Sequence, residues 1–120
     1  MIAQYTQAGL VSDSKRLAVP ASVDSIPSSA MQEDHVSMGW HAARKLRRII
    51  DNLGKILAIE LVAAARAIEL RAPLQPSPVT GDLIARLRES VPGSGPDRFL
   101  APELATAEDF VWTMRPQPGR

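Results

Sequence analysis

The strongest pattern in the chain is an apolar stripe at helical spacing through its centre. Apolar residues recur every three or four positions, and no proline interrupts them before Pro73. Such spacing aligns the apolar side chains along one side of an α-helix. The stripe consists of Trp40, Ala43, Leu46, Ile50, Leu53, Leu57, Leu61, Ala64 and Ile68. We therefore expect one very long bundle helix over about 30–71, roughly 60 Å long at 1.5 Å per residue.

A helix-start signal precedes this stripe. Ser29 and Gln32 fit a capping box, in which a Ser hydroxyl and a Gln side chain satisfy backbone amides of the first turn. Glu33 and Asp34 would then lie in the first turn, where carboxylates complement the positive end of the helix dipole. The pattern thus predicts a helix that begins at about residue 30.

The flanking segments predict a mainly α chain that forms part of a larger helical fold. Prolines disfavour regular structure in the connector that follows the first helix. The expected order is an N-terminal helix in 1–19, a loop over 20–29, the long helix over 30–72, and short C-terminal helices with a tail over 73–120, all in one partial domain. Within that last part we expect helices from Thr80 to about Glu89 and from about Pro102 to Trp112, and a disordered tail from Arg115.

The two halves of the long helix differ in polarity. The first half has a polar face formed by Arg44, Lys45, Arg47, Arg48, Asp51, Asn52 and Lys55. The second half is apolar nearly all round, and such a helix has to be surrounded by protein. Because the rest of the chain offers little cover, we expect packing against other chains or a further portion of the protein. The isolated chain should self-associate or be partly molten. Gly39 and Gly54 are weak points, each costing about 1 kcal/mol relative to Ala.

Composition limits the chemistry. The 120 residues contain no cysteine, which excludes disulfides, thiolate nucleophiles and cysteine zinc sites and fits a cytoplasmic protein. The net charge of +1 gives no global field to attract nucleic acid or an anionic membrane. The N-terminus lacks the charged start and apolar run of a secretory signal. The most apolar window, Ile56 to Leu70, is shorter than the ~20 residues of a bilayer span.

The best candidate site is the polar cluster Gln32, Glu33, Asp34 and His35, which places an amide, two carboxylates and an imidazole in consecutive positions. Glu33 is the strongest candidate, as a base or as a carboxylate that holds a cationic or imidazole substrate. The structural alternative is a first-turn carboxylate that only complements the helix dipole. Gln32 and Asp34 share this ambiguity, and Gln32 is more readily explained as the capping partner of Ser29.

Other polar groups point less clearly to a site. His35 and His41 are not spaced to share one helix face, so we predict no metal site. The basic run from Arg44 to Arg48 lacks interleaved aromatic residues, and we interpret it as a solvated helix face and not as a nucleic-acid patch.

Residues 20–39 closely resemble the C-terminal signature of histidine ammonia-lyases, through the segment Ile-Pro-Ser-Ser-Ala-Met-Gln-Glu-Asp-His-Val-Ser-Met-Gly. Gln4–Ala8, Ala43–Lys45 and Leu70–Pro73 resemble the same region, so the resemblance extends from about residue 1 to 104. It implies a mostly helical homotetramer that eliminates ammonia from an aromatic amino acid, with urocanate as the product from histidine in histidine catabolism. The family's electrophile is a methylidene-imidazolone group that forms from an Ala-Ser-Gly tripeptide.

The resemblance also implies roles for two residues. The family position that matches Glu33 lies in the active site and contacts the imidazole or the amino group of the substrate. Related phenylalanine and tyrosine lyases carry Asn-Gln where this chain has Gln32-Glu33. A carboxylate accepts a hydrogen bond from an imidazole N–H, which a phenyl ring lacks. The resemblance thus predicts histidine as the substrate, Glu33 as a catalytic residue, and Gln32 with Glu33 as substrate-binding residues.

The chain departs from the family pattern in what it lacks. It contains no Ala-Ser-Gly tripeptide, and neither the family's tyrosine loop nor its carboxylate-binding arginine. The expectation is therefore the C-terminal part of a histidine ammonia-lyase that is inactive alone, with no cofactor formed from this chain. Its partner would be a second copy or an N-terminal lyase portion. The alternative is a non-catalytic helical oligomerisation or interaction protein.

Overall fold

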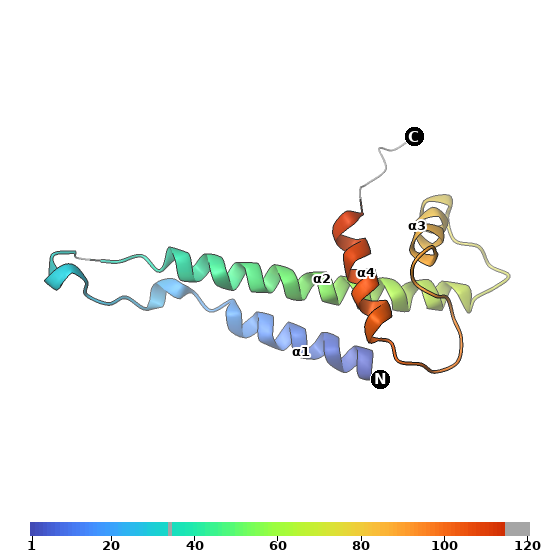
Figure 1. Ribbon diagram of the computed structural model, residues 1–120, viewed down its shortest axis with the longest axis horizontal. Coiled ribbons are helices and arrows are strands. Elements are labelled where there is room, and N and C mark those ends of the chain that lie inside the picture. Colours follow the sequence, from blue (N-terminus) through green and yellow to red (C-terminus); the bar gives the residue numbers. More distant parts are fainter. Residues whose placement is uncertain (34, 115–120) are drawn as a thin grey trace. The chain divides into compact units, whose positions relative to one another are not determined.

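The computed structural model describes residues 1–33 and 35–114, and this part of the chain is mainly helical (Figure 1). Its α-helices are α1 (Ile2–Leu17), α2 (Gly39–Glu69), α3 (Pro78–Arg88) and α4 (Ala101–Thr113), and its short 3-10 turns are Ala21–Val23 and Ser29–Met31. The expected mainly α fold with one very long helix is confirmed. The tail expected from Arg115 lies outside the described residues. Within them, no helix has an apolar stretch that would cross a membrane.

The shorter helices lie where local signals predict them, with small shifts at their ends. α3 begins at Pro78, slightly before the expected Thr80. Ser77 caps this helix, because its Oγ accepts a hydrogen bond from the Thr80 backbone N at 3.3 Å. Pro78 occupies the first turn, where its missing N–H is not needed.

The expected start of the long helix at residue 30 is wrong, since α2 begins at Gly39. Ser29, Ala30 and Met31 have φ angles of 52°, 53° and 65°, in the left-handed region that a right-handed helix excludes. Ser29 therefore has the wrong backbone conformation for an N-cap, and the predicted capping box is not formed. Near its other end α2 stops at Glu69, close to the expected boundary.

The described chain divides into two compact units, Met1–Leu53 and Gly54–Arg120, and α2 contributes to both. In the first unit, Asn52 on α2 donates from Nδ2 to Asp13 Oδ2 at 3.0 Å and to Ser14 Oγ at 3.2 Å. Asn52 is only 6% exposed, so its assignment to the polar, solvated face is wrong. Its amide is buried, and the α1 partners satisfy it.

The hydrophobic core of the second unit gathers around small side chains. Its buried members are Ala58 and Ala65 from α2, Leu87 from α3, Val91 after α3, and Ala107 from α4. Alanine allows helix backbones to approach closely, while Leu87 and Val91 are the largest fully buried side chains. The core is therefore built where three helices of this unit meet.

Much of the apolar stripe on α2 is not covered by the described residues. The exposed fractions are 80% for Trp40, 57% for Leu46, 41% for Ile50, 48% for Leu53 and 45% for Leu57. Only positions towards the end of the stripe, such as Leu61, pack against the core of the second unit. The described part of the chain thus leaves an apolar helix surface without a cover.

Gly54 on α2 is predicted to resist replacement, because it lies against the ring of Trp112. A Cβ at this position would lie 2.7 Å from Trp112 Cε2 and 2.9 Å from its Nε1. We expect Gly54→Ala to destabilise the chain by about 1 kcal/mol, since overpacking exceeds the gain in helix propensity. Urea unfolding followed by circular dichroism measures this change.

Gly9→Ala is the matched control, because nothing lies within 4 Å of a Cβ built at Gly9 on α1. This control should stabilise the chain by about 1 kcal/mol. Gly54→Ala should also become stabilising when Trp112 is replaced by Ala. A stabilising Gly54→Ala in the otherwise unchanged chain would contradict the prediction.

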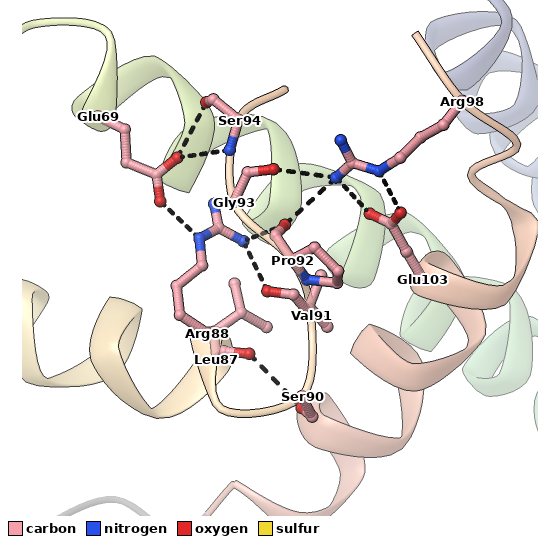
Figure 2. A network of polar contacts seen from close by, with 10 residues as sticks. All are labelled: Glu69, Leu87, Arg88, Ser90, Val91, Pro92, Gly93, Ser94, Arg98 and Glu103. Atoms are coloured by element: carbon pink, nitrogen blue, oxygen red, sulfur yellow. Dashed lines mark hydrogen bonds and ion pairs between the residues drawn. The ribbon is translucent and has the colours of Figure 1, made fainter. Parts of the chain in front are cut away.

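A polar network connects the end of α2 with the segment that follows α3 (Figure 2). Arg88 Nε donates to Glu69 Oε1 at 2.5 Å, and the Ser94 backbone N and Oγ donate to Glu69 Oε2 at 3.2 and 3.0 Å. Arg88 Nη1 also donates to the carbonyls of Val91 at 3.4 Å and Pro92 at 3.3 Å. The hydrogen bond from Arg88 holds the pKa of the Glu69 carboxyl below its usual value.

A second ion pair extends this network towards α4. Arg98 Nη2 donates to Glu103 Oε2 and to the Gly93 carbonyl, both at 2.9 Å. The hydrogen bond from Arg98 lowers the pKa of Glu103. The two arginines therefore fasten the loop between α3 and α4 at both ends.

Candidate functional site

The candidate residues lie in a hairpin-like reversal of the segment that connects α1 with α2. Ser28 and Glu33 form an isolated antiparallel β-bridge. Between them, Met31 N donates to the Ser28 carbonyl at 2.9 Å, and Gln32 N donates to the Ser29 carbonyl at 3.1 Å. The reversal is the light blue to cyan end of the connecting segment in Figure 1. Glu33 therefore follows a tight turn.

A second contact joins the two arms of the reversal on the side away from the turn. Ser25 Oγ donates to the Val36 carbonyl at 3.2 Å. Because backbone and side-chain hydrogen bonds fasten the reversal at several points, the position of Glu33 depends on the whole segment and not on a helix end.

The carboxylate of Glu33 is exposed and held on one side. Ser28 Oγ donates to Glu33 Oε2 at 2.9 Å, whereas no hydrogen bond to Oε1 is found among the described residues. The first turn of α2 holds no acidic residue, so the alternative that Glu33 complements the dipole of this helix is wrong. An exposed carboxylate with one oxygen anchored can accept a hydrogen bond or a proton from a ligand.

The other candidates are brought together only in part. Gln32 is exposed and ends the turn immediately before Glu33. His35 is exposed near the turn, and His41 is exposed on α2. Asp34 lies outside the described residues. Across residues 1–33 and 35–114, no group of three or more acidic, histidine or cysteine side chains is placed to hold a metal.

Part of the basic run is engaged in contacts within the first unit. Arg48 Nε lies 3.3 Å from Asp13 Oδ2, and Lys45 Nζ donates to the Val19 carbonyl. Arg48 thus connects α2 with α1, and Lys45 connects α2 with the segment that follows α1. The interpretation of the run as a solvated face holds for Arg44 and Arg47, which are exposed.

Sequence reasoning missed Ser28 as a partner of Glu33. The two residues flank the turn, and only the left-handed conformation of residues 29–31 brings their side chains together. In the sequence, Ser28 and Ser29 are adjacent and equally suited to cap a helix. No local signal separates them.

Comparisons with known proteins show the family to which the chain belongs. A sequence model of the aromatic amino acid lyase family matches residues 1–89. The chain is 70% identical over 112 residues to the histidine ammonia-lyase of Streptomyces avermitilis and 68% identical over 114 residues to that of Streptomyces griseus. Each comparison covers 92% of this chain and 22% of the relative.

A solved structure is similar over nearly the same extent. The crystal structure of histidine ammonia-lyase from Trypanosoma cruzi matches with a TM-score of 0.90 and 38% identity, covering 94% of this chain and 22% of that one. The chain thus spans about a fifth of the length of the relatives it matches. Since the family match extends over most of its residues, this chain belongs to the aromatic amino acid lyase family.

Proposed function

We propose that this chain forms part of a histidine ammonia-lyase, in which Glu33 lines the substrate pocket as a catalytic residue and Gln32 adds to substrate binding. The observation that carries the proposal is the exposed Glu33 carboxylate, anchored through one oxygen by Ser28. Its second oxygen, to which no described residue donates a hydrogen bond, suits the N–H group of an imidazole ring. The histidine ammonia-lyases named above support histidine as the substrate class.

The chain's own residues contribute to substrate binding and proton transfer, and not to the electrophile. In the family, the methylidene-imidazolone group supplies the electrophile that allows ammonia to leave. The Ala-Ser-Gly tripeptide that forms it does not occur in the 120 residues. We therefore propose that the chain is inactive alone, and that Glu33 holds the imidazole or accepts a proton once the remaining lyase residues are present.

The uncovered apolar stripe on α2 supports packing against a partner. Contiguous apolar patches larger than a few hundred Å² are unusual on monomeric proteins. We propose that side chains such as Trp40, Leu46 and Leu57, all at least 45% exposed, pack against a lyase N-terminal portion or a second copy. A homotetramer in the cytoplasm is the assembly that the family membership favours.

A chimeric enzyme tests this function. In the chimera, this chain replaces the matching segment of the Streptomyces avermitilis histidine ammonia-lyase, to which it is 70% identical. We expect the chimera to convert histidine into urocanate, measured by ultraviolet absorbance, at a rate within about tenfold of that enzyme, because substitutions away from functional sites have small effects. The isolated chain should produce no urocanate.

The same experiment separates the proposal from its alternative. A non-catalytic interaction protein would assemble with the lyase portion through the apolar stripe, but it would not restore turnover. A chimera that sediments like the parent enzyme without making urocanate would therefore favour the interaction protein. Urocanate production by the isolated chain would contradict the proposed need for residues that it lacks.

A further inference from the structure

We propose that Ser28 is a positioning residue for Glu33, which it orients for contact with the imidazole of the substrate. This inference rests on the proposed function and adds a residue to it. Ser28 is half-buried and Glu33 is exposed. Their side chains are joined directly, because Ser28 Oγ donates to Glu33 Oε2 at 2.9 Å.

The backbone places the two side chains opposite each other. Ser28 and Glu33 are the paired residues of an antiparallel bridge, and directly opposite residues of such a pair project their side chains to the same face. The bridge therefore brings the Ser28 hydroxyl and the Glu33 carboxylate to the same side of the segment, where they form the hydrogen bond.

The turn between the paired residues is strained. Ser29, Ala30 and Met31 all adopt positive φ, although none of them is glycine. Tight turns of this left-handed kind usually carry Gly, Asn or Asp, which adopt positive φ at little cost. Strained backbone persists only where its surroundings over-determine it, and it gathers at functional sites.

The surroundings that hold this turn are visible. Two turn hydrogen bonds close it from inside, at the Ser28 and Ser29 carbonyls, and the Ser25 hydroxyl fastens the arms at Val36. A helix that began at residue 30 would place Glu33 in its first turn and would not contain the β-bridge between Ser28 and Glu33. In the strained turn, the Glu33 carboxylate lies within hydrogen-bond distance of the Ser28 hydroxyl.

Anchoring one oxygen has a consequence for catalysis. A glutamate side chain has several rotatable bonds, and ordering them on substrate binding costs free energy. When Ser28 holds Oε2, the carboxylate is already oriented and Oε1 is presented to the ligand. Residues that orient metal ligands typically change activity about 10–100-fold when they are removed, and by analogy we expect an effect at the lower end of that range for Ser28.

The test measures histidine deamination in the chimera described above. We expect Ser28→Ala to lower kcat/KM about tenfold, while Ser28→Thr, which keeps the hydroxyl, stays within about twofold of the unchanged chimera. Ser28→Cys keeps the size but donates weakly, so it should behave like Ser28→Ala and replaces it if the alanine variant fails to assemble. Ser22→Ala, at an exposed serine of the same connecting segment, is the matched control without effect.

A double-mutant cycle distinguishes positioning from a structural role. If Ser28 acts through Glu33, Ser28→Ala should cause no further loss in a chimera that already carries Glu33→Gln. An equal loss in both backgrounds would overturn the inference, and so would full activity of Ser28→Ala where Glu33→Gln is impaired. Full activity of Glu33→Gln would instead overturn the proposed function, and this inference with it.

Discussion

Replacing Glu33 by Gln in the chimera is expected to lower kcat for histidine deamination by about 10²-fold or more. Gln has nearly the same shape but carries no charge and does not take up a proton at neutral pH. Its carbonyl can accept only part of the hydrogen bonding of a carboxylate, and its NH₂ group would face the imidazole N–H as a second donor. The rate of urocanate formation measures the loss.

The matched control is Glu89→Gln, which makes the same chemical change at an exposed residue at the end of α3. This variant should keep the activity of the unchanged chimera. Thermal unfolding of both variants should be close to that of the unchanged chimera, because surface substitutions usually change stability little. Undiminished turnover by Glu33→Gln would rule out the proposed role of the carboxylate.

Arg88→Ala is expected to destabilise the second unit by about 2 kcal/mol, because it leaves a partly buried carboxylate without its charged partner. The Arg88 and Glu69 side chains are 17% and 29% exposed, so solvent screens their contact less than an exposed pair. The variant also leaves the Val91 and Pro92 carbonyls without this donor. Urea unfolding of the chain at one protein concentration measures the change in unfolding free energy.

Arg71→Ala is the control for this variant, since the exposed Arg71 side chain makes no hydrogen bond or ion pair among the described residues. Its effect should stay within about 0.5 kcal/mol. Equal unfolding free energies of the Arg88 and Arg71 variants would show that the network of Figure 2 does not stabilise the unit.

The same network sets the sign of the pH dependence. The pKa values of Glu69 and Glu103 are lowered in the folded chain by Arg88 and Arg98. A carboxyl with a lower pKa in the folded state stabilises the fold above its unfolded pKa, and this stabilisation is lost as the pH falls through the folded pKa. The unfolding free energy should therefore fall below about pH 4.5, the usual value for Glu, and the fall should be smaller for Arg88→Ala.

The apolar spacing and local end signals predicted where the helices lie, except for the start of α2. The stripe around Leu57 predicted α2, and the prolines after it marked its end. Ser77 caps α3 and Pro78 is its first residue, whereas the prediction placed the start of this helix at Thr80. The apolar stripe and the helix-end signals depend on residues within a few positions of each other, so they can be recognised in the sequence.

The candidate site shows where local reasoning stops. Ser29 and Gln32 fit a helix start as well as any pair in the chain, yet the segment forms a left-handed turn. The family resemblance pointed to Glu33, but not to its contact with Ser28. A capping box would pair the Gln32 backbone amide with the Ser29 hydroxyl, whereas in the turn this amide donates to the Ser29 carbonyl. The residues around them are compatible with both arrangements.

By itself, the sequence determined the helical class, the presence of one long central helix and where it ends, and the identity of the candidate carboxylate. Only the tertiary structure decided that Asn52 is buried against Asp13 and that Arg88 binds Glu69. The physical reason is the range of the interactions. Helix formation is governed by neighbours a few residues apart, whereas polar partners far apart in the chain meet only after the helices have packed.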